Sequence, residues 1–194
     1  LLNFFDQIET PKLREYIASI YSEGKHLEYL LTGMLRLFSL DSGSENWNWQ
    51  VISLPEALRR VLEAHDVRIR EMNLDLHVDF PVDLLPVWAD QDKLELLFDA
   101  LVDNAVKFNR QGGRLSVTAG NLTLHGEPTL YLQISNQGKT VPRENAEDIF
   151  QEYSQLGELD TGKPTGVGVG LATCRAILRQ MQGEIFLEPN DEEG

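Results

Sequence analysis

Apolar side chains near the start of the chain recur at alternating spacings of four and three residues. Thr10-Pro11 is typical of a helix start, with threonine as the N-cap and proline at the first helical position. The spacing continues for about four heptads and predicts one long helix. Its apolar seam consists of Leu13, Ile17, Ile20, Gly24, Leu27, Leu31, Met34 and Phe38. We expect the helix to end near Asp41-Ser42-Gly43 and to pack in a coiled coil or bundle, although a lone amphipathic helix on its own domain has similar spacing.

The rest of the chain mixes strand and helix patterns. A polar, turn-rich stretch from Ser42 to Trp49 is the best linker candidate, so we place a domain boundary there and divide the chain into residues 1–44 and 45–194. We expect strands at 50–54, 74–80, 114–124 and 129–135, a turn at 125–128, and a closing strand from 184. The strand at 74–80 alternates apolar and polar residues and should be half-buried. We expect helices at 55–70, 91–109 and 168–181, with a short helix at 143–150.

The strands and helices do not alternate as regular βαβ units. This irregular order predicts an α+β fold, a two-layer α/β sandwich with helices on one face of a largely antiparallel sheet, preceded by the long bundle helix.

Composition narrows the choice of partners and setting. The net charge of −14 and pI near 4.6 argue against nucleic acid and against anionic membrane surfaces, since both attract concentrated Lys and Arg. A single cysteine, Cys174, excludes an intramolecular disulfide and a cysteine-cluster metal site, which favours a cytoplasmic setting. No apolar run approaches the roughly 20 residues that span a bilayer, so we expect membrane attachment only through regions outside this chain.

The most informative segment is a glycine-rich turn that leads into a helix, Thr165-Gly166-Val167-Gly168-Val169-Gly170-Leu171-Ala172. Glycines at this spacing let the backbone approach phosphates, and the exposed amides at the helix start favour an anion. The turn is not a P-loop, because it lacks the Gly-Lys-Ser/Thr ending, and it does not follow a strand as a Rossmann fingerprint would. Tight packing without a ligand produces similar turns, so the segment alone leaves both interpretations open.

A second candidate lies on the helix before Gly112. The amide oxygen of Asn104 can ligate Mg²⁺, and Lys107 lies three residues further on the same helix face, where its ammonium can meet a phosphate. The alternative is a solvated polar stripe on an amphipathic helix.

Together these segments resemble the nucleotide-binding domain of sensor histidine kinases, within the superfamily that includes gyrase-type and chaperone-type ATPases. Asn104-Ala-Val-Lys107-Phe108 looks like the N box of that family, Asp148-Ile-Phe150 through Tyr153 resembles its F box, and the glycine run resembles its second glycine box. Residues 22–43 are similar to the second helix of the dimerisation and phosphotransfer hairpin, two of which form a four-helix bundle in the family. The resemblance covers nearly the whole chain and makes residues 45–194 the catalytic ATP-binding domain.

The resemblance also implies the site and its cofactors, ATP and Mg²⁺. Asn104 would bind magnesium, Lys107 would touch a phosphate, and residues 151–165 would form a lid over the nucleotide. The implied ATP-binding residues are Asn104, Lys107, Phe108, Asn136, Gly138, Gly166, Gly168, Gly170 and Leu171.

The first glycine box of the family departs from its usual pattern here. Asn136-Gln137-Gly138-Lys139-Thr140 stands where Asp-x-Gly-x-Gly is expected. In the family this aspartate accepts a hydrogen bond from the adenine amino group, so the resemblance implies that the neutral acceptor at Asn136 weakens adenine binding by on the order of 1–2 kcal/mol. Thr140 replaces a glycine, and a positive φ there would be strained. Ala100 stands where the family often has another asparagine.

None of the four histidines lies in the context of the phosphoaccepting H box. His26 lies on the hairpin match, His65 in the following helix, His77 on the polar side of a strand and His125 in a turn. We interpret all four as surface or packing residues, so the catalytic histidine is unknown and lies outside this chain.

Two functions are consistent with these residues. The first is the ATP-binding core of a two-component sensor histidine kinase, which transfers the γ-phosphoryl group of ATP to that histidine. The alternative is a pseudokinase with a degenerate pocket that acts as a dimerising regulatory scaffold, favoured by Asn136, Thr140 and Ala100. For either we expect a homodimer through the bundle helices and a response regulator or another kinase as partner. The heptad helix disfavours a gyrase-type or chaperone-type ATPase.

Overall fold

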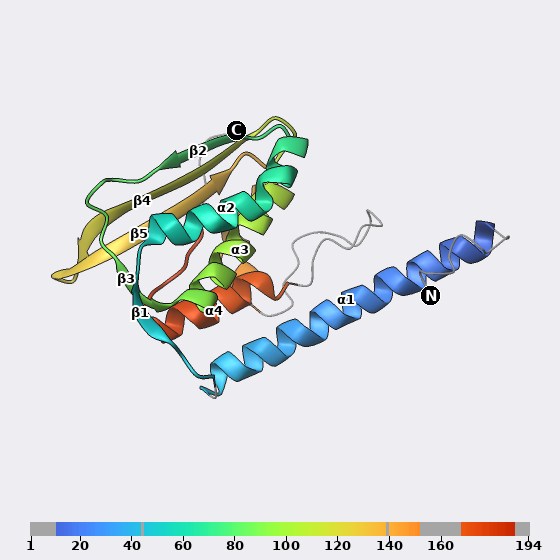
Figure 1. The fold of residues 1–194 in the computed structure, drawn as a ribbon, viewed down its shortest axis with the longest axis horizontal. Helices are drawn as coiled ribbons and strands as arrows, with labels where there is room; N and C mark the ends of the chain where they lie inside the picture. The colour runs from blue at the N-terminus through green and yellow to red at the C-terminus, as the bar shows by residue number, and fades with distance from the viewer. Residues whose placement is uncertain (1–10, 44, 139, 152–167, 189–194) are drawn as a thin grey trace.

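The computed structural model describes residues 11–43, 45–138, 140–151 and 168–188. The elements in chain order are α1 (Pro11–Asp41), β1 (Trp49–Ile52), α2 (Leu54–Glu71), β2 (Asp75–Asp79), β3 (Val87–Asp90), α3 (Gln91–Lys107), β4 (Arg114–Leu124), β5 (Glu127–Asn136), two 3-10 turns (Arg143–Asn145 and Asp148–Phe150) and α4 (Gly170–Gln180). Figure 1 shows α2, α3 and α4 packed as one layer against the sheet of β2, β4 and β5, while α1 extends away from it. The expected α+β sandwich with a long leading helix is confirmed.

The main sheet has the strand order β2-β4-β5. β4 and β5 pair antiparallel through the two-residue turn His125-Gly126, where both residues have positive φ, 53° and 88°. Such a turn matches the twist of a hairpin. β2 pairs with β4 in parallel, and β1 pairs with β3 antiparallel in a separate two-stranded sheet.

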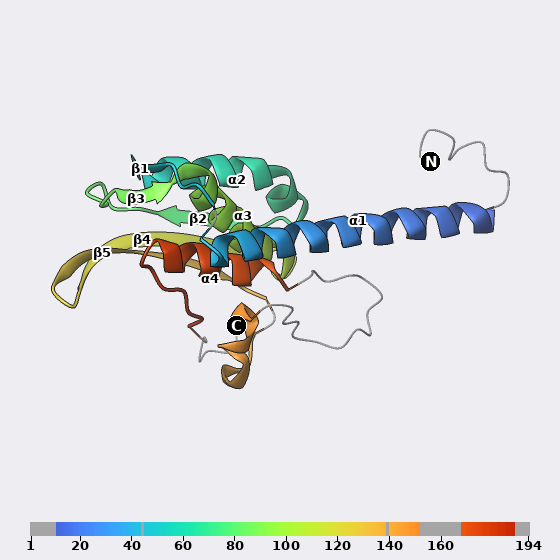
Figure 2. The same cartoon turned by 90° about the horizontal axis from the view of Figure 1, so that it is seen from below.

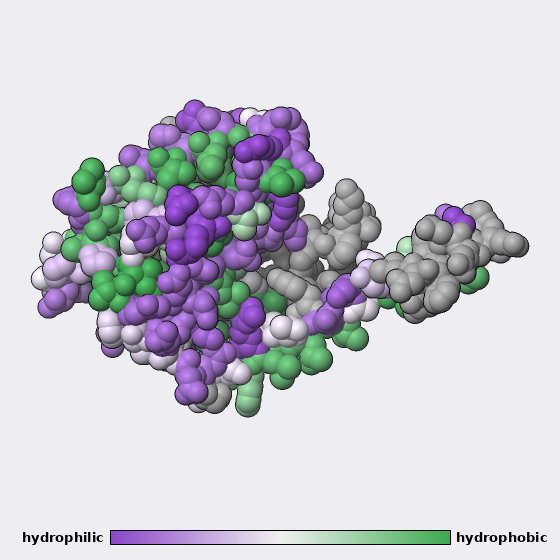
Figure 3. Space-filling view, viewed as in Figure 1, coloured by the Kyte–Doolittle hydropathy of each residue, from purple (hydrophilic) through white to green (hydrophobic). Residues whose placement is uncertain are grey.

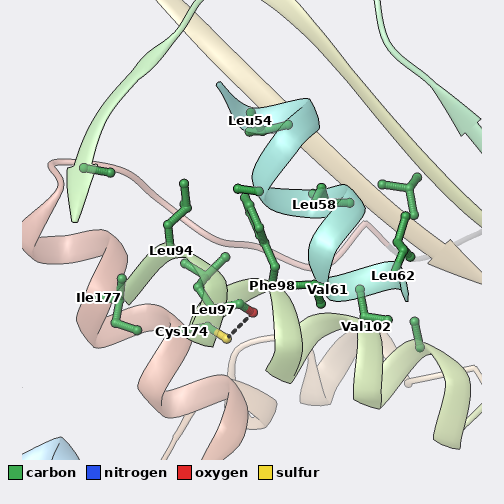
Figure 4. Close-up of a cluster of buried hydrophobic side chains, with 14 of the residues drawn as sticks. Leu54, Leu58, Val61, Leu62, Leu94, Leu97, Phe98, Val102, Cys174 and Ile177 are labelled. Carbon is green, nitrogen blue, oxygen red and sulfur yellow. Dashed lines mark hydrogen bonds between the residues drawn. The ribbon is translucent and has the colours of Figure 1, made fainter. Parts of the chain in front are cut away.

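The core lies between the helix layer and the apolar face of the sheet. Alternate residues of β4, namely Leu115, Val117 and Ala119, are buried against the helices, as period two requires. The helices contribute the residues that Figure 4 labels, which are Leu54, Leu58, Val61 and Leu62 of α2, Leu94, Leu97, Phe98 and Val102 of α3, and Cys174 and Ile177 of α4. α3 therefore lies in the middle of the helix layer, in contact with both of its neighbours.

The seam of α1 remains exposed along the described helix. Leu13 is 48% exposed, Leu27 66% and Phe38 72%, so this seam does not pack on the chain's own domain. A neighbouring row of residues, Leu30, Gly33, Leu37 and Leu40, instead packs toward the domain, and we call it the docked stripe. In Figure 2 the second half of α1 lies along α4, and the first half extends beyond the described part of the domain. Figure 3 shows hydrophobic side chains on the surface of α1. The bundle interpretation fits these observations better than the lone-helix alternative.

The end of α1 was predicted correctly, and its geometry explains why. Gly43 has a φ of 64°, a left-handed conformation that glycine adopts without strain, and its N–H donates to the carbonyl of Leu40 at 3.3 Å. Within the described residues, no helix is both long and apolar enough to cross a membrane.

Four details of the expected secondary structure were wrong. The pattern gave no signal for β3, which is only four residues long. β2 is exposed rather than half-buried, because it lies at the sheet edge beyond the cover of the helices, and Leu76 and Val78 are 39% and 41% exposed. The helix at 143–150 consists of two 3-10 turns. Residues 184–188 form no strand, although Glu188 accepts a hydrogen bond from Gln133 of β5 at 3.4 Å.

Candidate functional site

The candidate site lies at the C-terminal half of α3. The N-terminal start of this helix is held in place by several contacts. Asp90 caps α3 by accepting from the backbone N–H of Lys93 at 3.1 Å, and its other oxygen accepts from the N–H of Asn48 at 2.7 Å. Lys93 forms an ion pair with Glu45 in addition. The stretch before β1 is therefore held on the helix start, and α3 presents Asn104 and Lys107 on its last turn.

Lys107 has an unusual electrostatic environment. Burial lowers its pKa below the ordinary value of 10.5; the nearby carboxylate of Asp103 opposes this, and the positive charge of Arg68 adds to the lowering. Asp103 also forms an ion pair with Arg68 of α2. The ammonium nitrogen of Lys107 lies 5.2 Å from the centre of the Phe108 ring, within the range of a cation–π contact. An incoming anion would therefore meet a partly desolvated cation, in surroundings that strengthen its attraction.

At the C-terminal end of α3, the chain after β5 crosses the backbone of Phe108 and Asn109. Gly138 forms an antiparallel bridge with Asn109, and a Cβ atom at Gly138 would overlap the carbonyl oxygen of Phe108. The side-chain amide of Asn136 donates to that same carbonyl at 3.3 Å. Glycine at 138 is therefore required by a backbone crossing, and the Asn136–Gly138 segment lies directly beside the predicted N box.

The other end of the site is formed by the start of α4. A Cβ atom at Gly170 would lie 3.8 Å from the Cβ of Ala100, so α4 begins against α3 one turn before Asn104. The thiol of Cys174 contacts the carbonyl of Leu97 at 3.6 Å (Figure 4), and burial raises its pKa to about 12, which makes it unreactive. The start of α4 is thereby held beside the helix that carries Asn104 and Lys107.

The glycine run reaches α4 through a residue with a positive φ. Gly168 has a φ of 71°, and Val169, the N-cap of α4, is only 3% exposed. Both the backbone N–H and the hydroxyl of Thr173 donate to the carbonyl of Val169, at 2.9 and 2.8 Å. A backbone that turns through glycine into a helix start presents amide groups to an anion.

The structure thus gathers three separate parts of the sequence around α3. They are the last turn of α3, the Asn136–Gly138 segment and the start of α4, and they carry the predicted residues Asn104, Lys107, Phe108, Asn136, Gly138, Gly168, Gly170 and Leu171. Gly166, the greater part of the predicted lid and Tyr153 of the F box match lie outside the described residues. Phe150 of that match is buried in the domain.

Two residues with structural importance for the site gave no signal in the sequence. Asn109 is 8% exposed and holds the turn after α3 by donating to the carbonyl of Arg114 at 3.1 Å. Val169 stands in the glycine run without a predicted role, yet its side chain is buried. In both cases the role depends on a contact with a distant segment, which spacing along the chain cannot report.

His65, His77 and His125 lie as expected, whereas the side chain of His26 is outside those that the structure describes. His65 is buried at the α2–α3 interface, where its Nε2 lies 2.8 Å from a carboxylate oxygen of Asp99, and His77 and His125 are exposed. A pocket of about 430 Å³ is found at a different place, between β1, the start of α2 and residues 81–86, and none of the predicted site residues lines it. Within the described part of the chain, no group of three or more His, Cys, Asp or Glu side chains is arranged to hold a metal ion.

Comparisons with known proteins agree with the geometry. A family model described as "Histidine kinase-, DNA gyrase B-, and HSP90-like ATPase" matches residues 89–194. The adaptive-response sensory kinase SasA of Crocosphaera subtropica is 26% identical over 187 residues, which are 94% of this chain and 48% of that protein. SasA of Synechococcus sp. (strain CC9311) is 31% identical over 160 residues, covering 80% of this chain and 40% of that protein. The chain spans about half the length of SasA.

Solved structures show the same fold. Full-length ShkA, solved in complex with AMPPNP, matches with a TM-score of 0.73 and 22% identity, over 94% of this chain and 37% of that one. Histidine kinase ThkA, solved in complex with the response regulator protein TrrA, matches with a TM-score of 0.67 and 23% identity, over 98% of this chain and 52% of that one. Neither the family model nor these proteins support the pseudokinase alternative.

Proposed function

The chain belongs to the family of histidine kinase-, DNA gyrase B- and HSP90-like ATPases and contains the histidine kinase-type ATPase domain of a sensor kinase, and we propose that this domain uses ATP and Mg²⁺ to phosphorylate a histidine outside this chain. In this proposal residues 45–194 are the catalytic ATP-binding domain and residues 1–44 belong to the dimerisation and phosphotransfer region. The setting that we propose is cytoplasmic.

The observation that carries the proposal is that the Asn136–Gly138 segment and the start of α4 both lie against the C-terminal half of α3. Asn104 would supply an amide oxygen to Mg²⁺, a ligand type that suits this hard cation, which usually binds few protein groups. Such a site needs few protein ligands, in keeping with the lack of an acidic cluster in the described part of the chain. The chemistry of the residues therefore fits magnesium and a nucleotide.

The residues of the site have separable roles. The carbonyl oxygen of the Asn136 side chain accepts from the adenine amino group, because its amide nitrogen donates to Phe108. Lys107 neutralises charge on the phosphates from a partly desolvated position. Gly168, Gly170 and Leu171, with Gly166, present backbone amides at the start of α4. Bound ATP supplies the phosphoryl group, and the chain contributes positioning and charge stabilisation.

The exposed seam of α1 supports a homodimer. Leu27, Leu31 and Phe38 are each more than half exposed along a regular apolar row, and a symmetric bundle would bury this row against its copy. We propose that the phosphoaccepting histidine lies in the part of the bundle outside this chain. By analogy with ThkA, a response regulator is the expected partner, with another kinase as the alternative.

Calorimetric titration of Mg-ATP into the chain and into an Asn104→Ala variant tests the proposal. We expect micromolar binding by the unchanged chain and a loss of about tenfold or more in the variant, because a magnesium ligand is removed. An Asn46→Ala variant, changed at an exposed loop position, serves as the control and should bind like the unchanged chain. Absence of Mg-ATP binding by the unchanged chain would refute the proposal.

A further inference from the structure

One residue of the docked stripe of α1, Gly33, contacts the candidate site directly. Gly33 faces Val169, the buried N-cap residue of α4 at the end of the glycine run. A Cβ atom at position 33 would lie 2.8 Å from Cγ2, 3.4 Å from Cβ and 3.7 Å from Cγ1 of Val169. The whole side chain of Val169 therefore packs on the surface that Gly33 leaves open, and no larger residue fits there without displacement.

The contact has little room to adjust. Valine is branched at Cβ and restricted to few side-chain conformations, so it cannot swing away as a longer side chain would. Its backbone is also fixed, since its carbonyl accepts two hydrogen bonds from Thr173. A displacement of Val169 must therefore move the first turn of α4 or move α1 outward.

A second contact holds α1 further along the same helix pair. The side-chain amide of Gln180, at the end of α4, donates to the carbonyl of Leu40 at 3.3 Å, in the last turn of α1. This carbonyl also accepts from the N–H of Gly43. Leu37 and Leu40 are buried, at 4% and 1% exposure. The Gly33–Val169 and Leu40–Gln180 contacts occur in the same order along both helices. Together they fix the position of α1 along the axis of α4.

From this geometry we infer that Gly33 is a positioning residue through which α1 controls the phosphate end of the nucleotide site. When α1 is docked, Val169 and the start of α4 are held in place. When α1 lifts away, Val169 loses the surface that buries it and the first turn of α4 is free to shift. Fixing the first turn of α4 then has to accompany nucleotide binding, so the undocked chain binds nucleotide more weakly. The effect on nucleotide rests on the proposed function, whereas the docking itself does not.

Two neighbouring positions on α1 provide a test. Gly33→Leu places a side chain against Val169, whereas Thr32→Leu is the control, because Thr32 is exposed and belongs to neither the seam nor the docked stripe. Both changes raise the helix propensity of α1. We expect Gly33→Leu to lower Mg-ATP affinity by about tenfold and to speed hydrogen exchange of the backbone amides in the second half of α1, with neither change in Thr32→Leu.

A rescue experiment separates positioning from general damage. Gly33→Ala introduces one methyl group, and Val169→Ala removes the two methyl groups that it would meet, so the double variant should recover affinity relative to Gly33→Ala alone. The single thiol of Cys174 faces α3, not α1, and its labelling should stay slow in every variant if α4 remains folded.

The outcomes are distinguishable. Equal affinities of Gly33→Leu and Thr32→Leu, or additive effects in the double variant, would overturn the coupling. Unchanged hydrogen exchange in Gly33→Leu would overturn the docking contact itself. If the unchanged chain bound no Mg-ATP, the proposed function and the nucleotide coupling would both fail, and hydrogen exchange would still decide whether Gly33 sets the position of α1.

Discussion

The two ends of the candidate site are built by different means. At the Asn136 end, backbone crosses backbone, since Gly138 bridges Asn109 and the carbonyl of Phe108 accepts from Asn136. At the Gly170 end, helices meet through side chains, and α1 contributes one of the contacts. A backbone crossing has one geometry, whereas packed helices can separate. The Asn136 end is therefore fixed by the fold, whereas the Gly170 end can change with the position of α1.

The largest effect should come from Gly138→Ala. A Cβ atom there overlaps the carbonyl oxygen of Phe108, which cannot move without breaking the bridge, so we expect a loss of about 3 kcal/mol or more in the free energy of unfolding, or failure to fold. Denaturant unfolding followed by circular dichroism measures it. Gly24→Ala is the control, and a Gly138→Ala chain as stable as this control would show that the first end is not rigid.

Lys107→Met should weaken Mg-ATP binding by about tenfold, because a charged contact with phosphate is lost. Lys25→Met, on the exposed surface of α1, is the control and should leave affinity unchanged.

The protonation of Lys107 gives a second measurement at the same residue. Because the pKa of Lys107 is lowered, part of its side-chain population is neutral in alkaline buffers whose pH is still below 10.5, the ordinary pKa of lysine. A bound phosphate favours the charged form, so binding should take up protons and affinity should fall as pH rises through that window. Without nucleotide, the unfolded chain binds more protons there, so the free energy of unfolding should rise with pH. Titration in buffers of different ionisation enthalpy reports the uptake, and its persistence in Lys107→Met would assign it elsewhere.

Asn136→Asp should change two measurements in opposite directions. The variant cannot donate to the carbonyl of Phe108, so we expect the free energy of unfolding to fall by about 1 kcal/mol. A charged acceptor should at the same time tighten binding of the adenine by several-fold. Parallel thermal unfolding and calorimetry measure both, and a variant that gained in both would contradict the hydrogen bond to Phe108.

The smallest effect on stability should come from Gly170→Ala, the counterpart of the first prediction. Its Cβ would meet Ala100 at 3.8 Å, an ordinary contact, and alanine favours the helix, so the free energy of unfolding should rise by up to about 1 kcal/mol. A loss as large as that of Gly138→Ala would mean that the two ends are equally rigid.

Sequence patterns predicted the long elements well, because their periodicity extends over many residues. α3 was expected at 91–109 and ends at Lys107, and β4 was predicted at its observed bounds. β3 was missed because four residues hold too little periodicity, and the burial of β2 was misjudged because an edge position is set by neighbours along the sheet, not by alternation within the strand.

The candidate site was predictable in part. Asn104, Lys107 and the glycines were found from motif spacing, but their grouping around α3 depends on contacts such as Gly170 with Ala100. Asn136 looked only like a weakened acceptor, and its hydrogen bond to Phe108 appears only in the folded chain. The sequence could not predict a role for Gly33, because a glycine within a helical pattern does not show which distant side chain occupies the space beside it.

The two apolar rows of α1 lie one residue apart, for example Gly33 beside Met34 and Leu37 beside Phe38. One residue corresponds to a rotation of about 100° around a helix axis, so the rows face different neighbours. Selection can therefore act on each row separately. Among chains that keep the α1–α4 contact, a larger residue at position 33 should be accompanied by a smaller one at position 169, while position 34 varies independently of both.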